Sequence, residues 1–314
     1  KEETPRVMGV ILSISATLII STNLLVAAAL LKLLLKRGCQ SWCFVLNLAV
    51  ADTLVGVAIT GLGKTRCLLR MAFLTSPCMV SILSMFLISL DRYVAIKMPL
   101  RYSMMSGKGK TAGSLLAVWI SSFTMGFLPA GPYDGFCAFF TVIHDIAIIV
   151  LYCLLFFPVL SLFIYMYLDI LKIACVHHKQ ISQIRQTSSR ADDNHHGPSH
   201  WSHVKALRTV AVLVGCFLVL WSPFFVVCIV HLLCRKCALK EVLENYLWLL
   251  GLLNSLINPL VYACWQREVR LQLSAMFSCI TSRLTSAAPP SALERSHSEA
   301  HRITRAICCP IRQL

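Results

Sequence analysis

The chain has 314 residues, of which 57% are hydrophobic and only 14% are charged, and its mean hydropathy is +0.72. Soluble domains carry about 25% charged residues, so this composition excludes a soluble protein and indicates one that crosses a membrane several times. A formal charge of +15 is sometimes a sign of nucleic-acid binding. Here the basic residues stand in short stretches beside apolar segments, as in the loops of membrane proteins, so no nucleic-acid partner is expected.

Seven apolar segments follow one another along the chain, each long enough to cross a hydrocarbon core of about 30 Å as a helix. They occupy residues 7–35, 41–63, 67–98, 112–129, 139–173, 204–233 and 242–264. The polar stretch at 177–202 is predicted to be a flexible loop. Residues 265–279 combine apolar and basic residues at helical spacing, which predicts an amphipathic helix on the membrane surface. The predicted fold is an all-α membrane protein: a seven-transmembrane-helix bundle over residues 7–264 with a short cytosolic amphipathic helix.

The lysines and arginines at the ends of these segments set the orientation. They are more numerous on the side that holds Lys36 and Arg37 than on the side that holds Lys64, and the side richer in basic residues faces the cytosol. Residues 1–6 are then extracellular and, because the chain starts at lysine rather than methionine, are expected to belong to a longer N-terminus. Residues 280–314 are predicted to form a cytosolic tail. The expected location is the plasma membrane, which the chain crosses several times.

Fifteen cysteines are spread over the chain, most of them in apolar segments, where a thiol packs as a small apolar side chain. Cys67, at the outer end of the third segment, and Cys137, in the loop before the fifth, are both predicted to be extracellular, where disulfides persist. We predict that these two pair. The spacing of Cys234 and Cys237 allows a second bridge but does not decide whether it forms. Cys279 lies at the end of the amphipathic stretch and is either a palmitoylation site or a free thiol.

Several polar residues lie inside the apolar segments, and Asp52 is the most costly of them. A carboxylate at mid-membrane costs roughly 2.5–3.5 kcal/mol, so it is a functional candidate by default. Asn23, Ser81, Asn254 and Asn258 lie in the interior of the first, third and seventh segments. Their oxygens are hard ligands that suit a small cation such as Na⁺. A hydrogen-bonded layer that fixes the packing between helices is the alternative, and the residues alone favour it.

Two prolines and one charged triplet mark places where helices can bend or bind a partner. Pro223 and Pro259 each remove a backbone hydrogen bond and bend the sixth and seventh segments. Asp91, Arg92 and Tyr93 stand together at the cytosolic end of the third segment. Arg92 has two candidate partners there: its neighbour Asp91 and a protein that docks from the cytosol.

This arrangement resembles the class A (rhodopsin-like) G-protein-coupled receptors, over all seven segments and in the same order. The residues that carry the resemblance are Asn23, LAVAD at 48–52, Cys67 with Cys137, DRY at 91–93, Trp119, Pro158, Trp221 with Pro223, and NPLVY at 258–262. The resemblance implies a receptor and not an enzyme, without catalytic residues. It implies an allosteric sodium site at Asp52, completed by the four polar residues named above, and no other cofactor. The residues implied to face a heterotrimeric G protein are Asp91, Arg92, Tyr93 and Tyr262, and arrestin is a further implied partner.

Within this family, six more stretches resemble receptors for fatty acyl-ethanolamides, such as oleoylethanolamide, and for lysophospholipids. They are LRMAF at 69–73, GFLP at 126–129, LKIA at 171–174, KALRTV at 205–210, YLWLLG at 246–251 and WQREVRLQL at 265–273. Such receptors raise cyclic AMP through a stimulatory G protein and act in glucose-dependent insulin secretion. The resemblance implies a lipid-like agonist between the third, fifth, sixth and seventh helices, beside Arg70, Trp221, Phe224, Phe225, Glu244 and Trp248. Burial of an acyl chain there contributes about 0.8 kcal/mol per CH₂ group.

Two features depart from the pattern of those relatives. Cys67 follows Asp52 by only 15 residues, which shortens the outer end of the second segment and the loop after it. His203 stands where some family members carry an acid that pairs with Arg92, so that ion pair is not expected.

Other protein classes fit the sequence less well. A receptor for an amine or an adenosine-like ligand is the alternative within the family. An amine receptor normally has an acid one turn or so below Arg70, where residues 74–76 are Leu, Thr and Ser. A membrane transporter would be expected to have two related halves, and the sequence contains no such repeat. Six histidines between 177 and 203 suggest a metal site, yet they fall in the stretch predicted to be a polar loop.

Overall fold

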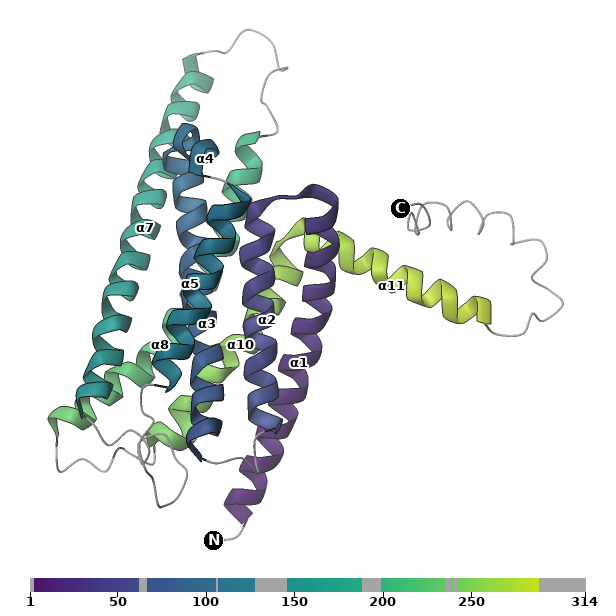
Figure 1. The fold of residues 1–314 in the computed structure, drawn as a ribbon. Coiled ribbons are helices and arrows are strands. Elements are labelled where there is room, and N and C mark those ends of the chain that lie inside the picture. Colours follow the sequence, from purple (N-terminus) through teal and green to yellow (C-terminus); the bar gives the residue numbers. More distant parts are fainter. Residues whose placement is uncertain are drawn as a thin grey trace.

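The computed structural model describes residues 3–61, 67–105, 107–127, 146–187, 199–234, 239 and 242–287. Nearly all of them are helical, and none of the described residues is in a strand. The long helices run roughly side by side and form one bundle, with the N-terminus at the end opposite the short helix α4 (Figure 1). The predicted all-α bundle is therefore confirmed.

The predicted segments correspond to long helices with somewhat different ends. In chain order the elements are α1 (Glu3–Arg37), α2 (Gln40–Gly61), α3 (Cys67–Lys97), α4 (Pro99–Met105), α5 (Lys108–Phe127), α7 (Ile146–Thr187), α8 (Ser199–Leu233), the π-helical turn η1 (Leu243–Leu247), α10 (Trp248–Trp265) and α11 (Arg267–Ala287). Five of them, α1, α2, α3, α7 and α8, contain a stretch long and apolar enough by itself to cross a membrane. The shorter apolar helix in α10 and the 20-residue α5 take the two remaining positions of the predicted seven.

The prediction of a flexible loop at 177–202 is wrong at both of its ends. Helix α7 continues to Thr187, and α8 begins already at Ser199. The physical reason is that a helix is costly to start and cheap to extend, so an apolar membrane helix carries polar residues beyond its end in the same conformation. The end of α7 therefore projects past α3 on the side of α4 (Figure 1).

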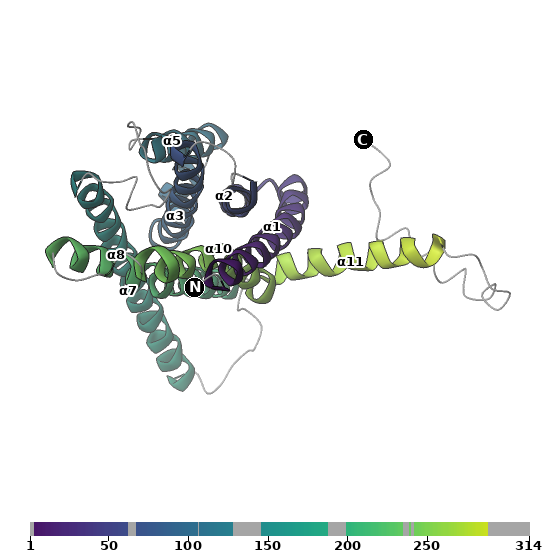
Figure 2. The same cartoon turned by 90° about the horizontal axis from the view of Figure 1, so that it is seen from below.

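The last predicted segment also differs from a single straight helix. It starts with the π-helical turn η1 and continues as α10, in which Pro259 is an interior residue. The amphipathic helix α11 ends at Ala287, beyond residue 279, where the prediction ended it. Figures 1 and 2 show α11 leaving the bundle sideways, as expected for a helix that lies along a membrane surface.

The connection between α1 and α2 is a tight turn at Gly38. This glycine has a φ of +61°, a conformation that residues with a side chain rarely adopt, and its N–H donates to the carbonyl of Leu34. Lys36 and Arg37 in the last turn of α1 complement the helix dipole. Because the turn is short, α1 and α2 pack as antiparallel neighbours.

The apolar core runs along the inside of the bundle, with α3 in contact with α2, α5, α7 and α8. Its largest fully buried side chains include Leu30, Leu48, Phe163 and Phe217. Many leucines and valines on the outer faces are exposed, such as Leu154 on α7 and Val219 on α8. In a chain that spans a membrane, these outer faces contact lipid, so only polar groups inside the bundle need protein partners.

Candidate functional site

An apolar cavity lies between α3, α7 and α8, in the half of the bundle away from α4. It is lined by Thr75, Cys78, Met79, Ile82, Ile149, Tyr152, Cys153, Trp221, Phe224, Phe225 and Cys228. No charged residue is among these lining side chains. A lining of this character suits an apolar ligand.

Three residues that the sequence predicted for the ligand pocket, Trp221, Phe224 and Phe225, lie in this cavity. The ring of Phe224 meets those of Trp221 and Phe225 edge to face, with centroids 6.1 and 5.4 Å apart, and Phe225 also stacks on Phe156 of α7 at 3.8 Å. Such contacts hold aromatic rings in one arrangement. The side chains of the other three predicted residues, Arg70, Glu244 and Trp248, lie outside the described residues.

Trp221 packs against the backbone of α10 at Gly251. A Cβ atom built on this glycine would meet ring atoms of Trp221 at 2.8–2.9 Å, closer than carbon atoms can approach without moving. The absence of a side chain at Gly251 therefore lets the indole ring lie between α8 and α10 at the bottom of the cavity.

Asp52 is fully buried in the middle of the bundle and accepts three hydrogen bonds. Ser81 and Ser255 donate to Oδ1 at 2.7 and 2.8 Å, and the side-chain amide of Asn258 donates to Oδ2 at 2.9 Å. Donors from α3 and α10 thus meet a carboxylate from α2. We call Asp52, Ser81, Ser255 and Asn258 the polar layer.

Asn23 and Asn254, also predicted here, contact the same region in different ways. The amide of Asn23 donates to the carbonyl oxygens of Ile19 and Ser255, both at 2.9 Å, and so joins α1 to α10. The amide of Asn254 points to the sulfur of Met85 at 3.7 Å. The carbonyl oxygens Oδ1 of Asn254 and Asn258 are buried and have no hydrogen-bond partner among the described residues. Two acceptor atoms beside the polar layer therefore remain available to a donor or a cation.

A second buried network joins α2, α3 and α5. Asn47 donates to Ser84 at 2.7 Å and accepts from the indole N–H of Trp119 at 2.8 Å. Ser84 in turn donates to the carbonyl of Val80. The sequence pointed to Trp119 but not to Asn47, because an asparagine in the first two turns of an apolar segment is not costly enough to stand out.

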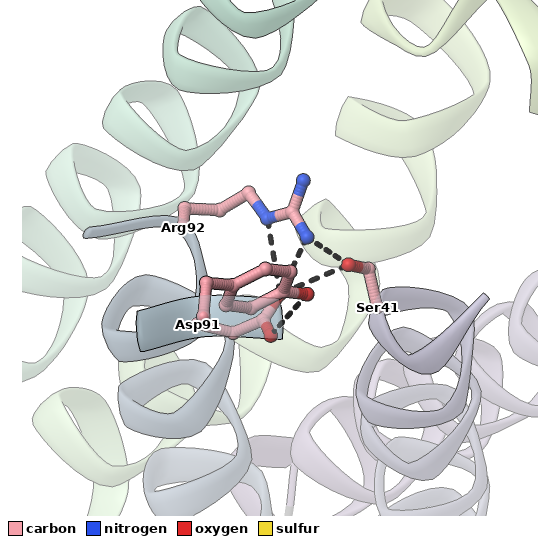
Figure 3. Close-up of polar contacts among 4 residues, drawn as sticks. Ser41, Asp91 and Arg92 are labelled. Atoms are coloured by element: carbon pink, nitrogen blue, oxygen red, sulfur yellow. Dashed lines mark hydrogen bonds and ion pairs between the residues drawn. The ribbon is translucent and has the colours of Figure 1, made fainter. Parts of the chain in front are cut away.

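Arg92 lies near the end of α3 that is predicted to be cytosolic and is held there by its neighbour Asp91 and by Ser41 of α2 (Figure 3). Its guanidinium donates to Asp91 Oδ2 from Nε at 3.1 Å and from Nη2 at 2.5 Å, and to the hydroxyl of Ser41. The side chain of Asp91 is only 4% exposed, whereas that of Arg92 is 20% exposed. Of the two partners predicted for Arg92, this structure contains the neighbouring acid. His203 stands where some family members carry an acid that pairs with Arg92, and its side chain lies outside the described residues.

Helix α4 also contacts this cluster. The hydroxyl of Tyr102 donates to Asp91 Oδ1 at 3.0 Å. Burial, and next the charge of Asp91, raise the pKa of Tyr102 above its ordinary value, so the phenol keeps its proton and remains a donor. Asp91 thus accepts from three elements, α2, α3 and α4, and fixes their ends relative to one another.

Tyr93 makes a separate contact with α7. Its hydroxyl donates to Asp169 Oδ2 at 2.8 Å and accepts from Lys97 Nζ at 2.9 Å, and Lys97 also forms an ion pair with Asp169. The ammonium group of Lys97 lies 5.2 Å from the ring centroid of Tyr93. Sequence analysis missed Asp169, because an acid near the end of an apolar segment costs less than one at mid-membrane and so gives less sign of a role.

The other predicted residues are placed as follows. Tyr262 is buried on α10, 3% exposed, and its hydroxyl has no hydrogen-bond partner among the described residues. Cys279 is a half-buried free thiol on α11. The predicted pair of Cys67 and Cys137 lies outside the residues whose side chains are described. Cys234 is disulfide-bonded, and its partner is not among the described cysteines.

Comparison with known proteins identifies the family that these features fit. The family model for the 7 transmembrane receptor (rhodopsin family) matches residues 22–262. This range includes the polar layer, Arg92 and every residue that lines the cavity.

Individual proteins are similar over most of the chain. The Glucose-dependent insulinotropic receptor of Homo sapiens is 48% identical over 299 residues, which are 88% of this chain and 88% of that protein. The same receptor of Rattus norvegicus is 46% identical over 287 residues, 85% of this chain and 61% of its own length. The Histamine H2 receptor of Homo sapiens is 28% identical over 262 residues, 76% of this chain and 70% of that receptor.

Proposed function

The chain belongs to the rhodopsin family of seven-transmembrane receptors, and from this premise we propose that it is a receptor for fatty acyl-ethanolamides and lysophospholipids that raises cyclic AMP through a stimulatory G protein. A protein of this family is a membrane receptor that acts through a G protein and is not an enzyme. The name of the insulinotropic receptors that it resembles points to a role in glucose-dependent insulin secretion. Beyond membership of the family, the proposal specifies the ligand, the type of G protein and the second messenger.

The observation that carries the ligand class is the lining of the cavity. Residues of α3, α7 and α8 around it are apolar or thiol-bearing apart from the hydroxyls of Thr75 and Tyr152 and the indole N–H of Trp221, and Tyr152 already donates to the carbonyl of Met125. An ammonium ligand needs a carboxylate partner when it is taken out of water, and none is among the lining residues. An acyl chain needs only apolar surface, which contributes about 0.8 kcal/mol per CH₂ group. A lipid is therefore favoured over an amine, although a histamine receptor is among the similar proteins.

The cytosolic end of the bundle supports coupling to a partner protein. Arg92 is partly exposed beside α4, whose Leu100 and Met104 are 85% and 80% exposed. Apolar side chains this exposed, next to a guanidinium and outside the apolar segments, suit contact with another protein. We propose that agonist binding shifts the bundle to a form in which α7 and α8 move apart at this end and Arg92 meets the G protein. Arrestin is proposed to bind the same face.

Cyclic AMP in cells that express the chain tests the proposal, with and without oleoylethanolamide. We expect a rise on addition of the lipid, and no rise in an Arg92→Ala variant that reaches the cell surface in equal amount. Arg267→Ala, which removes an exposed arginine from α11, is the matched control and should respond as the parent does. A parent chain present at the surface that gives no response would contradict the ligand assignment, and normal signalling by Arg92→Ala would contradict the coupling mechanism.

We also propose that Na⁺ binds at the polar layer as an allosteric ligand. The carboxylate of Asp52 and the unpartnered Oδ1 atoms of Asn254 and Asn258 are oxygen donors of the type that this ion prefers. Melting temperatures of the purified receptor in sodium chloride and in choline chloride test this. The parent should melt higher in sodium, and the difference should vanish in Asp52→Asn. Equal melting of the parent in both salts would refute the site.

The orientation and the cysteine modifications are proposals of the same kind. The N-terminus is proposed to be extracellular at the plasma membrane, so an epitope added before Lys1 should be stained on intact cells. Cys279 on α11 is proposed to carry a palmitoyl group. Metabolic labelling with an alkyne-bearing palmitate should then mark the parent and not Cys279→Ser, and equal labelling of both would exclude this cysteine.

A further inference from the structure

We propose that Lys97 and Asp169 are positioning residues that clasp the cytosolic end of α7 to α3 through the hydroxyl of Tyr93, and so restrain coupling in the absence of agonist. We call these three residues the α3–α7 clasp. This inference rests on the proposed function, because it assigns the clasp a role in the opening of the same cytosolic face.

The three side chains of the clasp all contact one another. Tyr93 donates to Asp169 at 2.8 Å, Lys97 donates to Tyr93 at 2.9 Å, and Lys97 and Asp169 form an ion pair. Lys97 also lies 5.2 Å from the centroid of the Tyr93 ring. Each member therefore contacts both of the others, and removal of either charge leaves the remaining two with a weaker contact.

The position of the clasp makes it relevant to opening. Lys97 is the last residue of α3, five residues after Arg92, whereas Asp169 lies on α7 about three turns past Pro158. Movement of α7 away from α3 must separate Asp169 from both of its partners. The Arg92 cluster joins α3 to α2 and α4 through Ser41 and Tyr102, so it does not resist this movement. The two contacts thus restrain different helices.

Because the clasp is partly exposed to water, its ion pair stabilises the closed form only weakly. The side chains of Lys97 and Asp169 are 38% and 21% exposed, and water weakens an ion pair of this kind. The positive charge of Lys172, further along α7, also attracts the carboxylate of Asp169. Such a contact shifts an equilibrium between two forms without locking it, which suits a restraint that agonist has to overcome.

The first test is basal cyclic AMP at matched surface expression. Lys97→Gln and Asp169→Asn should each raise the agonist-free signal about twofold to fivefold, the range that the loss of a partly exposed ion pair allows. The double variant should rise no further than either single variant, because both remove the same contact. Lys97→Arg and Asp169→Glu keep the charges and should stay near the parent. Lys108→Gln, which removes an exposed charge at the start of α5, is the matched control.

The second test does not depend on signalling. Spin labels on non-canonical amino acids at Met104 of α4 and Val176 of α7, both exposed, report the distance between the two helices in the purified receptor without agonist. Asp169→Asn should broaden this distance distribution and shift it to longer values, and Asp169→Glu should not. A parent chain that raises no cyclic AMP, with the distance shift intact, would refute the proposed function and leave the clasp standing. Unchanged distances in Asp169→Asn and Lys97→Gln, or additive rises in the double variant, would overturn the clasp.

Discussion

Replacement of Asp52 separates the role of its hydrogen bonds from the role of its charge. Both serine hydroxyls donate to Oδ1, and only Asn258 donates to Oδ2. In Asp52→Asn the amide oxygen can take the place of Oδ2 and go on accepting from Asn258. The new NH₂ group then takes the place of Oδ1 and can donate to the hydroxyls of Ser81 and Ser255, which rotate to donate to their own backbone. All three contacts then survive with two of them reversed.

Asp52→Ala has no such rearrangement. The serine hydroxyls can rotate to the carbonyl four residues earlier in their own helices, whereas the Asn258 amide loses its acceptor inside the bundle. One buried unsatisfied donor costs about 1–3 kcal/mol. The loss of the carboxyl group leaves a void that adds to this cost. We therefore expect Asp52→Ala to be destabilised by about 2–3 kcal/mol, and Asp52→Asn by less than about 1 kcal/mol, the scale of one neutral hydrogen bond.

Thermal unfolding of the purified receptor in detergent, without sodium, measures this difference. The melting temperature of Asp52→Ala should fall by several degrees, and that of Asp52→Asn should stay close to the parent. Asp52→Asn with Asn258→Asp, which exchanges the two groups, is a further control and should also remain near the parent. If Asp52→Asn melts as low as Asp52→Ala, the charge and not the hydrogen bonding holds the layer together, and the reasoning above is refuted.

Three further predictions concern the cavity and the packing around it. Gly251→Ala places a methyl group 2.8 Å from the ring of Trp221 and should lower stability by about 1–3 kcal/mol, the usual cost of overpacking; an unchanged melting temperature would show that the ring moves freely. Phe225→Ala removes an aromatic wall of the cavity, and the loss of about 1.5–3 kcal/mol of apolar contact should weaken binding of radiolabelled oleoylethanolamide by at least tenfold, whereas unchanged affinity would place the ligand elsewhere. Trp119→Phe removes the donor to Asn47 and should cost about 1 kcal/mol in thermal unfolding, while restored stability in a double variant with Asn47→Leu would confirm that the unsatisfied amide is the cause.

Three of the four residues of the polar layer, Asp52, Ser81 and Asn258, were predictable one by one, but the contacts between them were not. A carboxylate in an apolar segment is conspicuous in any sequence, and Asn258 and Ser81 share its depth. Ser255 was missed although it donates to Asp52 as closely as Ser81 does, because a serine in a membrane helix normally bonds to its own backbone and carries no signal. Which hydroxyl faces the carboxylate depends on the rotation of each helix about its axis, and only packing fixes that rotation.

The residues around Arg92 and Tyr93 also show that single residues are easier to predict than their contacts. The sequence indicated that Arg92 has either Asp91 or a docking protein as its partner, and the structure adds Ser41 from another helix. Nothing in the sequence placed Asp169 beside Tyr93, since the two residues are far apart in the chain. Contacts between helices depend on relative tilt and depth, which a periodic pattern does not contain.

By itself, the sequence determined that this protein crosses a membrane as a bundle of helices and which residues inside it are too costly to be accidental. The physical reason is that lipid gives a backbone no partner, so each crossing segment must be a helix and must show its apolar length in the chain. Only the tertiary structure decided that α3, α7 and α8 enclose the cavity, that α10 supplies two of the three donors to Asp52, and that Lys97 and Asp169 meet at Tyr93. Those contacts join residues from separate helices, and their geometry comes from how the helices pack, which no single segment encodes.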